Sequence, residues 1–107
     1  MSDFDPEAIF HRLMVAGEDW TDKDAAACML EETKKTLLAE LMTGFSGSNA
    51  ERERQALADA AYKHHIKTMV AARKEANRAK VRYDSTKVLA EMRRTEASTK
   101  RAEMMLR

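Results

Sequence analysis

No glycine and no proline occurs between Asn49 and Arg107, a stretch that covers more than half of the 107-residue chain. Because these two residues are the strongest helix breakers, their absence predicts one long, nearly continuous helix. All three glycines and the one proline lie within the first 47 residues. A long helix cannot cover its own apolar face, so this helix must pack on another part of the chain or on another molecule.

Two helices are predicted before that stretch. Asp5 is suited to the N-cap of the first, because its carboxylate can accept from free backbone N–H groups, and Pro6 fits the first helical position. Gly17 can adopt the left-handed conformation that ends helices, so we expect this N-terminal helix to be short. Thr21-Asp22-Lys23-Asp24 resembles a capping box and predicts the start of a second helix that runs to about Thr43.

The segment Gly44-Phe45-Ser46-Gly47 predicts a turn, and Ser48-Asn49-Ala50-Glu51 is a capping box that would open the long helix. The sequence therefore predicts an all-α fold in a single domain, residues 1–107: a helical hairpin with a short N-terminal helix and a long C-terminal helix. An unbroken third helix would extend about 90 Å and the second about 33 Å. The distal part would lack an intramolecular partner, which favours a coiled-coil-like homo-oligomer.

Two apolar seams with different phases run along the long helix. The first consists of Ala58, Tyr62, His65, Met69, Ala72, Ala76, Ala79 and Tyr83, and the second of Val81, Val88, Met92, Ala102 and Leu106, with Thr95 and Thr99 between them. The shift amounts to about 200° around the helix near residues 83–86. Either the helix breaks or kinks there, with Asp84 or Ser85 as a new N-cap, or a continuous helix contacts neighbours on both sides; the absence of breakers favours continuity. We expect Tyr83 and the second seam to contact another subunit or a partner.

Charge divides the chain into an acidic and a basic part. Residues 1–48, the predicted cap and hairpin helix, carry four Lys or Arg and ten Asp or Glu, whereas residues 49–107 carry fifteen and eight. Either the two halves neutralise each other, within one chain or between subunits, or one half binds a charged partner.

Basic residues recur every seven positions along the long helix, with a second row beside the first. The first row consists of Arg73, Lys80, Lys87, Arg94 and Arg101, and the second of Arg93, Lys100 and Arg107. Such a ridge suits a phosphate backbone, because each Lys or Arg that neutralises a phosphate releases counterions. An acidic protein surface would fit as well, and plain solvation of a charged helix face is the third reading.

The residues that usually carry catalysis or bind metals are not arranged for either role. Cys28 stands alone, and His64 and His65 are adjacent, so they point about 100° apart on a helix and cannot share one metal ion. No glycine-rich phosphate loop, nucleophile elbow or histidine–carboxylate spacing is present. We therefore expect no enzyme activity, no cofactor and no metal. His65 lies in the first seam and is expected to be a core or interface histidine.

Neither a membrane-spanning segment nor a signal peptide is visible in the sequence. No apolar run approaches the roughly 18 residues that a transmembrane helix needs. The N-terminus opens with acidic residues and lacks a basic segment followed by an apolar one. The cytoplasm is the expected compartment.

Two stretches of the basic half have the texture of a known group of proteins. Residues 69–84, Met-Val-Ala-Ala-Arg-Lys-Glu-Ala-Asn-Arg-Ala-Lys-Val-Arg-Tyr-Asp, and residues 91–97, Glu-Met-Arg-Arg-Thr-Glu-Ala, resemble small helical accessory proteins encoded by bacteriophages. Some proteins of that kind accompany recombination or single-stranded DNA functions. The resemblance implies a nucleic-acid setting and, for a phage protein, the cytoplasm of the host.

The leading functional hypothesis from the sequence is a non-enzymatic, oligomeric helical protein whose basic arm binds nucleic acid. The rival hypothesis is a protein-interaction module, such as a phage-type inhibitor or assembly adaptor. It would dock on its partner through the acidic first half or through the distal seam Val81, Val88 and Met92.

Overall fold

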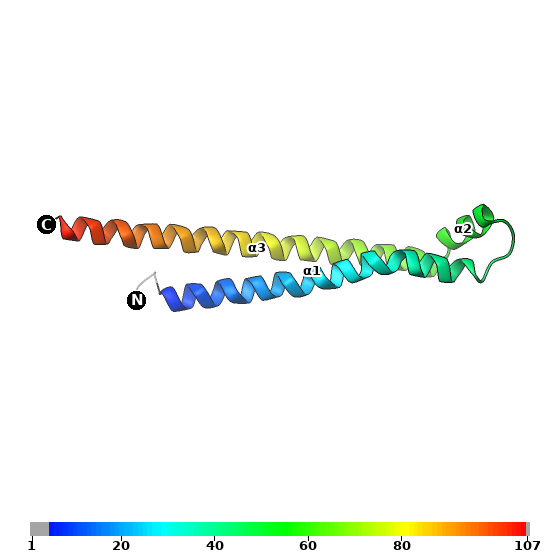
Figure 1. Cartoon of the computed structure of the whole chain (residues 1–107), viewed down its shortest axis with the longest axis horizontal. Coiled ribbons are helices and arrows are strands. Elements are labelled where there is room, and N and C mark those ends of the chain that lie inside the picture. Colours follow the sequence, from blue (N-terminus) through cyan, green and yellow to red (C-terminus); the bar gives the residue numbers. More distant parts are fainter. Residues whose placement is uncertain (1–4, 107) are drawn as a thin grey trace. The chain divides into compact units, whose positions relative to one another are not determined.

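The computed structural model describes residues 5–106, which form three helices. They are α1 (Pro6–Met42), α2 (Asn49–Leu57) and α3 (Ala60–Met105). The prediction of an all-α hairpin is confirmed: α1 and α3 pack antiparallel, with the short α2 between them in the chain (Figure 1). The predicted short N-terminal helix is wrong, because the first 42 residues contain one helix of 37 residues.

The start of α1 follows the sequence signals, whereas its expected interruption does not occur. The Asp5 carboxylate accepts from the backbone N–H of Glu7 at 3.0 Å, as an N-cap does. Gly17 and Thr21, however, lie inside the helix. The Thr21 hydroxyl donates to the Gly17 carbonyl at 2.8 Å, one turn back, so it serves the same helix instead of capping a new one.

The turn before α2 has the predicted chemistry. Gly47 is the glycine with positive φ, 116°, and the Glu51 side chain occupies the space that a Cβ at Gly47 would need. The Ser48 hydroxyl accepts from the Glu51 backbone N–H at 3.2 Å and so caps α2. Loop residues 43–48 therefore hold the conformation that the Gly-Ser capping signal predicts.

A break between α2 and α3 corrects the expectation of one continuous helix from Asn49. Asp59 N–H donates to the Ala56 carbonyl at 3.1 Å, three residues back, which tightens the end of α2. Asp59 is then the N-cap of α3: its carboxylate accepts from Ala61 N–H at 2.8 Å and its carbonyl from Lys63 N–H at 3.1 Å. An aspartate can restart a helix in this way without any glycine or proline.

Of the two predicted arrangements near residues 83–86, a break or a continuous helix, the structure has the continuous helix: α3 contains these residues without interruption. Its half-buried side chains keep to the first seam, which is confirmed from Tyr62 to Tyr83 and continues beyond it. The continuation consists of Thr86, Leu89, Ala90, Arg93 and Ala97. Ala58, predicted as the first seam residue, is exposed and lies outside α3.

The chain divides into two compact units, to which α1 and α3 each contribute a segment. We call residues 22–76 the loop unit, and residues 1–21 with 77–107 the terminal unit. The buried core consists of small side chains: Ala27, Ala56 and Ala76 in the loop unit and Ala79 in the terminal unit. Two helices can bury only the stripe along which they touch, so no large side chain among residues 5–106 is fully buried.

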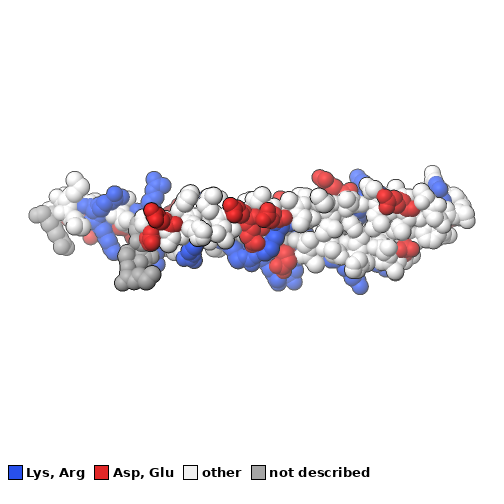
Figure 2. Space-filling view, turned by 90° about the horizontal axis from the view of Figure 1, so that it is seen from below, with Lys and Arg blue, Asp and Glu red and all other residues white. Residues whose placement is uncertain are grey.

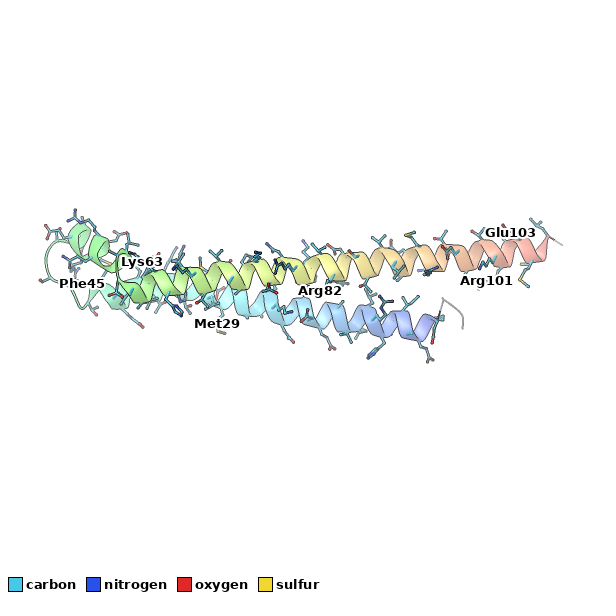
Figure 3. The ribbon with its side chains drawn as sticks, turned by 180° about the vertical axis from the view of Figure 1, so that it is seen from behind. Met29, Phe45, Lys63, Arg82, Arg101 and Glu103 are labelled. Atoms are coloured by element: carbon cyan, nitrogen blue, oxygen red, sulfur yellow. The ribbon has the colours of Figure 1, made fainter. Side chains whose placement is uncertain are left out.

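In the terminal unit, α1 covers α3 over part of its length. A Cβ at Gly17 would lie 3.7 Å from the Tyr83 ring, and residues further toward the C-terminus of α3 face residues nearer the start of α1. The expectation that the distal half of the long helix lacks any intramolecular partner is therefore wrong, because α1 is longer than predicted. Only the last turns of α3, which carry Arg101 and Glu103, continue past the first turn of α1 (Figures 1 and 3).

Candidate nucleic-acid interface

Arg73 is committed to interactions inside the loop unit. Its guanidinium donates to both Glu31 carboxylate oxygens, at 2.6 and 3.0 Å, and to Asp24 at 2.6 Å. A third contact reaches the Cys28 sulfur at 3.4 Å. The hydrogen bond from Arg73 holds the pKa of Glu31 below its usual range, and the hydrogen bonds to Glu31, Asp24 and Cys28 raise the pKa of Arg73. Of the predicted phosphate-binding residues, Arg73 is thus placed where it serves folding.

Lys80 lies beside the aromatic contact of the terminal unit. The rings of Trp20 and Tyr83 are 5.5 Å apart at an interplanar angle of 50°, and the Lys80 ammonium lies 5.8 Å from the centre of the Trp20 ring. The tilted ring pair and the cation over an aromatic face are both attractive arrangements. Tyr83 therefore contacts Trp20 of its own chain and is half-buried, and its contact with another subunit or partner stays a prediction.

Four basic residues of the predicted ridge form an exposed row on α3. Lys80, Lys87, Arg94 and Arg101 follow at steps of seven residues, so consecutive members are about 10 Å apart along the axis and nearly in line. Within residues 5–106, none of the four forms an ion pair; Arg101 donates to the Ser98 hydroxyl at 3.4 Å. We call these four residues the basic row. Basic side chains also project near the C-terminal end of α3 in the space-filling view (Figure 2).

The second predicted basic row is split by the packing of α3. Arg93 is half-buried and pairs with Glu96 at 3.2 Å, so it lies on the side of α3 that faces α1. Lys100 is exposed and forms no ion pair with any described residue. The two residues share one side of α3, but Lys100 is open to solvent whereas Arg93 is partly covered and paired. Arg107, the last member of the predicted row, lies outside the described residues.

The second apolar seam is exposed to solvent. The exposed fractions are 63% for Val81, 53% for Val88, 57% for Met92 and 88% for Leu106. The first seam provides the contact with α1. Of the second seam, Val81 borders α1 at a groove. Poorly buried helices with exposed apolar side chains of this size suggest a partner or an oligomer.

A groove of about 700 Å³ runs between α1 and α3 in the terminal unit. Its apolar wall includes Val15, Ala16 and Val81, and its polar rim includes Arg12 and Arg82. Ser85 and Thr86 of α3 and His11 and Asp19 of α1 complete the lining. Across the groove, Arg82 donates to the Asp19 carboxylate at 3.3 Å, and Arg82 is labelled in Figure 3.

Acidic residues of α1 and basic residues of α3 neutralise each other inside each unit. Arg73 meets Asp24 and Glu31 in the loop unit, and Arg82 meets Asp19 in the terminal unit. Of the two interpretations of the charge asymmetry, contact between the halves within one chain is therefore observed. The pairs join residues 42 to 63 positions apart, so no local spacing in the sequence could have found them.

His65 occupies the predicted core position in the loop unit. Its Nε2 donates to the Leu30 carbonyl at 2.8 Å, which defines the tautomer, because a carbonyl can only accept. Between residues 5 and 106 there is no group of three or more His, Cys, Asp and Glu side chains that could hold a metal ion. No helix in the described part of the chain is long and apolar enough to cross a membrane.

Comparisons with known proteins return no relative for this chain. No protein-family model, curated protein or solved structure matches it.

Proposed function

We propose that this protein is a non-enzymatic, oligomeric helical protein that binds the phosphate backbone of nucleic acid through the basic row of α3. The observation that carries the proposal is the placement of Lys80, Lys87, Arg94 and Arg101 on one exposed line, while the arginines beside α1 are paired with carboxylates. The resemblance of residues 69–97 to phage accessory proteins accords with this role.

The basic row would bind without reading base sequence. Its members sit on one helix and offer ammonium and guanidinium groups, while Tyr83, the tyrosine between Lys80 and Lys87 in the sequence, packs against Trp20. Contacts of this kind are electrostatic, and their affinity falls steeply as salt rises. Lys100, which is exposed next to Arg101 in the sequence, would add a further cation near the C-terminal end of the row.

The test is a titration of labelled single- and double-stranded DNA at several salt concentrations with the wild type and with Lys87→Ala/Arg94→Ala. Removing two phosphate contacts should reduce the slope of log affinity against log salt by roughly 1.4 on single strands and roughly 1.8 on duplex. Lys63→Ala/Lys67→Ala in the loop unit removes the same charge from exposed positions and is the matched control.

Two outcomes would contradict the proposal. Wild-type protein that binds neither form of DNA at low salt excludes the activity. A control variant that loses as much as Lys87→Ala/Arg94→Ala would show that net charge, and not the basic row, determines binding.

A protein-interaction module is the second candidate, and the exposure of Val81, Val88 and Met92 favours it. The acidic first half is less suited to this role, since Arg73 and Arg82 occupy Asp24, Glu31 and Asp19. Charge reversal discriminates: Arg94→Glu/Arg101→Glu should abolish nucleic-acid binding under the first proposal and leave protein binding intact under the second. Glu32→Lys/Glu40→Lys tests the acidic half at exposed positions that spare the Arg73 cluster.

A further inference from the structure

Seven positions on α3, together with Leu106 directly after it, recur in strictly alternating steps of four and three. They are Val81, Ser85, Val88, Met92, Thr95, Thr99, Ala102 and Leu106, and all eight are exposed. We call them the heptad face. Their mean spacing of 3.5 residues is that of helices which wrap around a partner helix, and it differs from the 3.6 of an isolated helix. The side chains that face α1, such as Ala90 and Ala97, lie about 150° away around α3.

We infer that the heptad face pairs with the heptad face of a second copy of this chain, with the two α3 helices antiparallel. This deepens the proposed function, on which it rests for the expectation of an oligomer, by naming the surface and the orientation. With full overlap, Val81 of one copy meets Leu106 of the other, and Val88 meets Thr99. α1 packs against the opposite side of α3 along most of the heptad face and borders it only at Val81 and Ser85, which line the groove.

Flanking charges select the antiparallel orientation. In a parallel, in-register pair, the residue directly before every second core position contacts the residue of the second copy that is five positions later in the sequence. Glu91, which precedes Met92, would therefore face Glu96 of the second copy. In the antiparallel pair, Arg82, which also contacts Asp19 of its own chain, faces Glu103 of the second copy, and the two-fold symmetry repeats this contact. Glu91 then lies beside Ser98 of the second copy. The antiparallel pair thus gains two attractive contacts and has no like-charge contact in its flanks.

The groove of the terminal unit lies at the end of this interface. Val81 belongs to both the groove and the heptad face, and Val15 beside it is 51% exposed. The antiparallel register brings Leu106 of the second copy to this apolar wall and Glu103 to a rim that carries Arg12 and Arg82. Apolar surface and charge therefore agree at this end.

The composition of the heptad face predicts reversible association. Five of its eight side chains are apolar, and the other three are Ser or Thr, which pack less favourably in a helix seam. Monomer and dimer should therefore exchange with protein concentration.

Pairing also determines where the basic rows lie. Each row flanks the side of the interface that carries Asp84, Glu91 and Ser98, so the antiparallel dimer presents both rows on one side. If the proposed function holds, the dimer offers nucleic acid eight cations where one chain offers four.

Disulfide trapping tests the orientation in a Cys28→Ala background without nucleic acid. Val88→Cys/Thr99→Cys should form a covalent dimer on mild oxidation, whereas each single variant should remain uncross-linked. Residues 88 and 99 of one helix are about 16 Å apart, so no internal bond can compete. Lys87→Cys/Arg94→Cys, outside the heptad face, is the control and should not cross-link. Single variants that cross-link as well as the double would overturn the antiparallel arrangement.

Sedimentation across a concentration series tests the surface. Wild-type protein should approach twice the mass of one chain, and Val88→Glu/Met92→Glu should stay monomeric with unchanged helix content. Val70→Glu is the matched control: Val70 is 58% exposed on α3 but lies eleven residues before the heptad face begins at Val81, outside the expected overlap of the two copies, so its variant should still dimerise. A wild type that is monomeric throughout, or a Val70→Glu variant that dissociates equally, overturns the inference. Neither result depends on DNA binding, which the basic-row variants test separately.

Discussion

The loop unit and the terminal unit use the same two helices in different ways. In the loop unit, polar side chains connect α1 and α3 through the Arg73 cluster and the His65–Leu30 hydrogen bond. In the terminal unit, the contact consists of Trp20, Tyr83 and the exposed Arg82–Asp19 pair, and α3 continues past α1. Both units leave apolar side chains exposed, such as Met29 and Val70 in the loop unit and Val88 and Met92 in the terminal unit. The units differ in how the two helices are connected, and we therefore expect substitutions in the loop unit to reduce stability more than substitutions in the terminal unit.

The largest expected effect comes from overfilling the alanine core of the loop unit. Ala76 is 1% exposed, so Ala76→Leu would force α1 and α3 apart and should cost about 1–3 kcal/mol of unfolding free energy. Ala71→Leu, exposed on the same helix, is the control, and Ala97→Leu probes the less covered part of α3. Thermal unfolding followed by circular dichroism measures all three. Equal losses at Ala76 and Ala97 would remove the contrast between the units.

Removal of Arg73 should have the next largest effect and should depend on pH. Because the pKa of Glu31 is lowered in the folded chain, the Arg73–Glu31 contribution is complete above the ordinary Glu range and disappears as the pH falls through that lowered pKa. Arg73→Gln should therefore lower the Tm at neutral pH, and its difference from wild type should shrink in acid. Lys74→Gln, exposed beside it, should do neither. A gap that stays constant with pH would contradict this account.

A smaller loss is expected from His65→Ala. This change removes the hydrogen bond to the Leu30 carbonyl and should cost about 1 kcal/mol. His64→Ala changes the same residue type at the exposed neighbouring position, so it corrects for helix propensity. The difference between the two variants in urea unfolding is the quantity to measure. Identical curves would show that the hydrogen bond adds nothing to the loop unit.

The smallest effect, and the one of opposite sign, is expected in the terminal unit at Gly17. An alanine Cβ there would lie 3.7 Å from the Tyr83 ring, an ordinary contact, so Gly17→Ala should raise the unfolding free energy by about 0.5–1 kcal/mol. Gly17→Leu should instead displace Tyr83 and lose stability. A destabilised alanine variant would show that the ring requires the glycine.

Local signals in the sequence predicted the ends of helices where side-chain caps determine them. Asp5 and Ser48 cap as expected, and Gly47 takes the positive φ of the turn. The predicted helix end at Gly17 and helix start at Thr21 were wrong. Tyr83 packs near Gly17, and the Thr21 hydroxyl bonds to its own helix, so α1 continues through both residues. The Gly17–Tyr83 contact joins residues 66 positions apart, which no local pattern encodes, whereas the Thr21 bond is local to the helix.

The sequence predicted the spacing of the basic residues along the helix but not which of them form ion pairs within the chain. The seven-residue period correctly placed Lys80, Lys87, Arg94 and Arg101 on one line, because helix geometry alone determines it. Whether a cation is free depends on its partners, and the carboxylates that occupy Arg73 come from α1. The break at Asp59 was likewise missed, since an aspartate cap carries a weaker signal than glycine or proline.

The continuation of α3 past the first turn of α1 has a consequence for deuterium uptake. Backbone amides near Ala76 are in a buried part of α3, so they exchange only when the helices separate. Amides from Ser98 onward are protected only by hydrogen bonds within α3, and these break first at the helix end. A lone chain should therefore show uptake that accelerates toward the C-terminus, and a partner laid along those last turns would flatten that gradient.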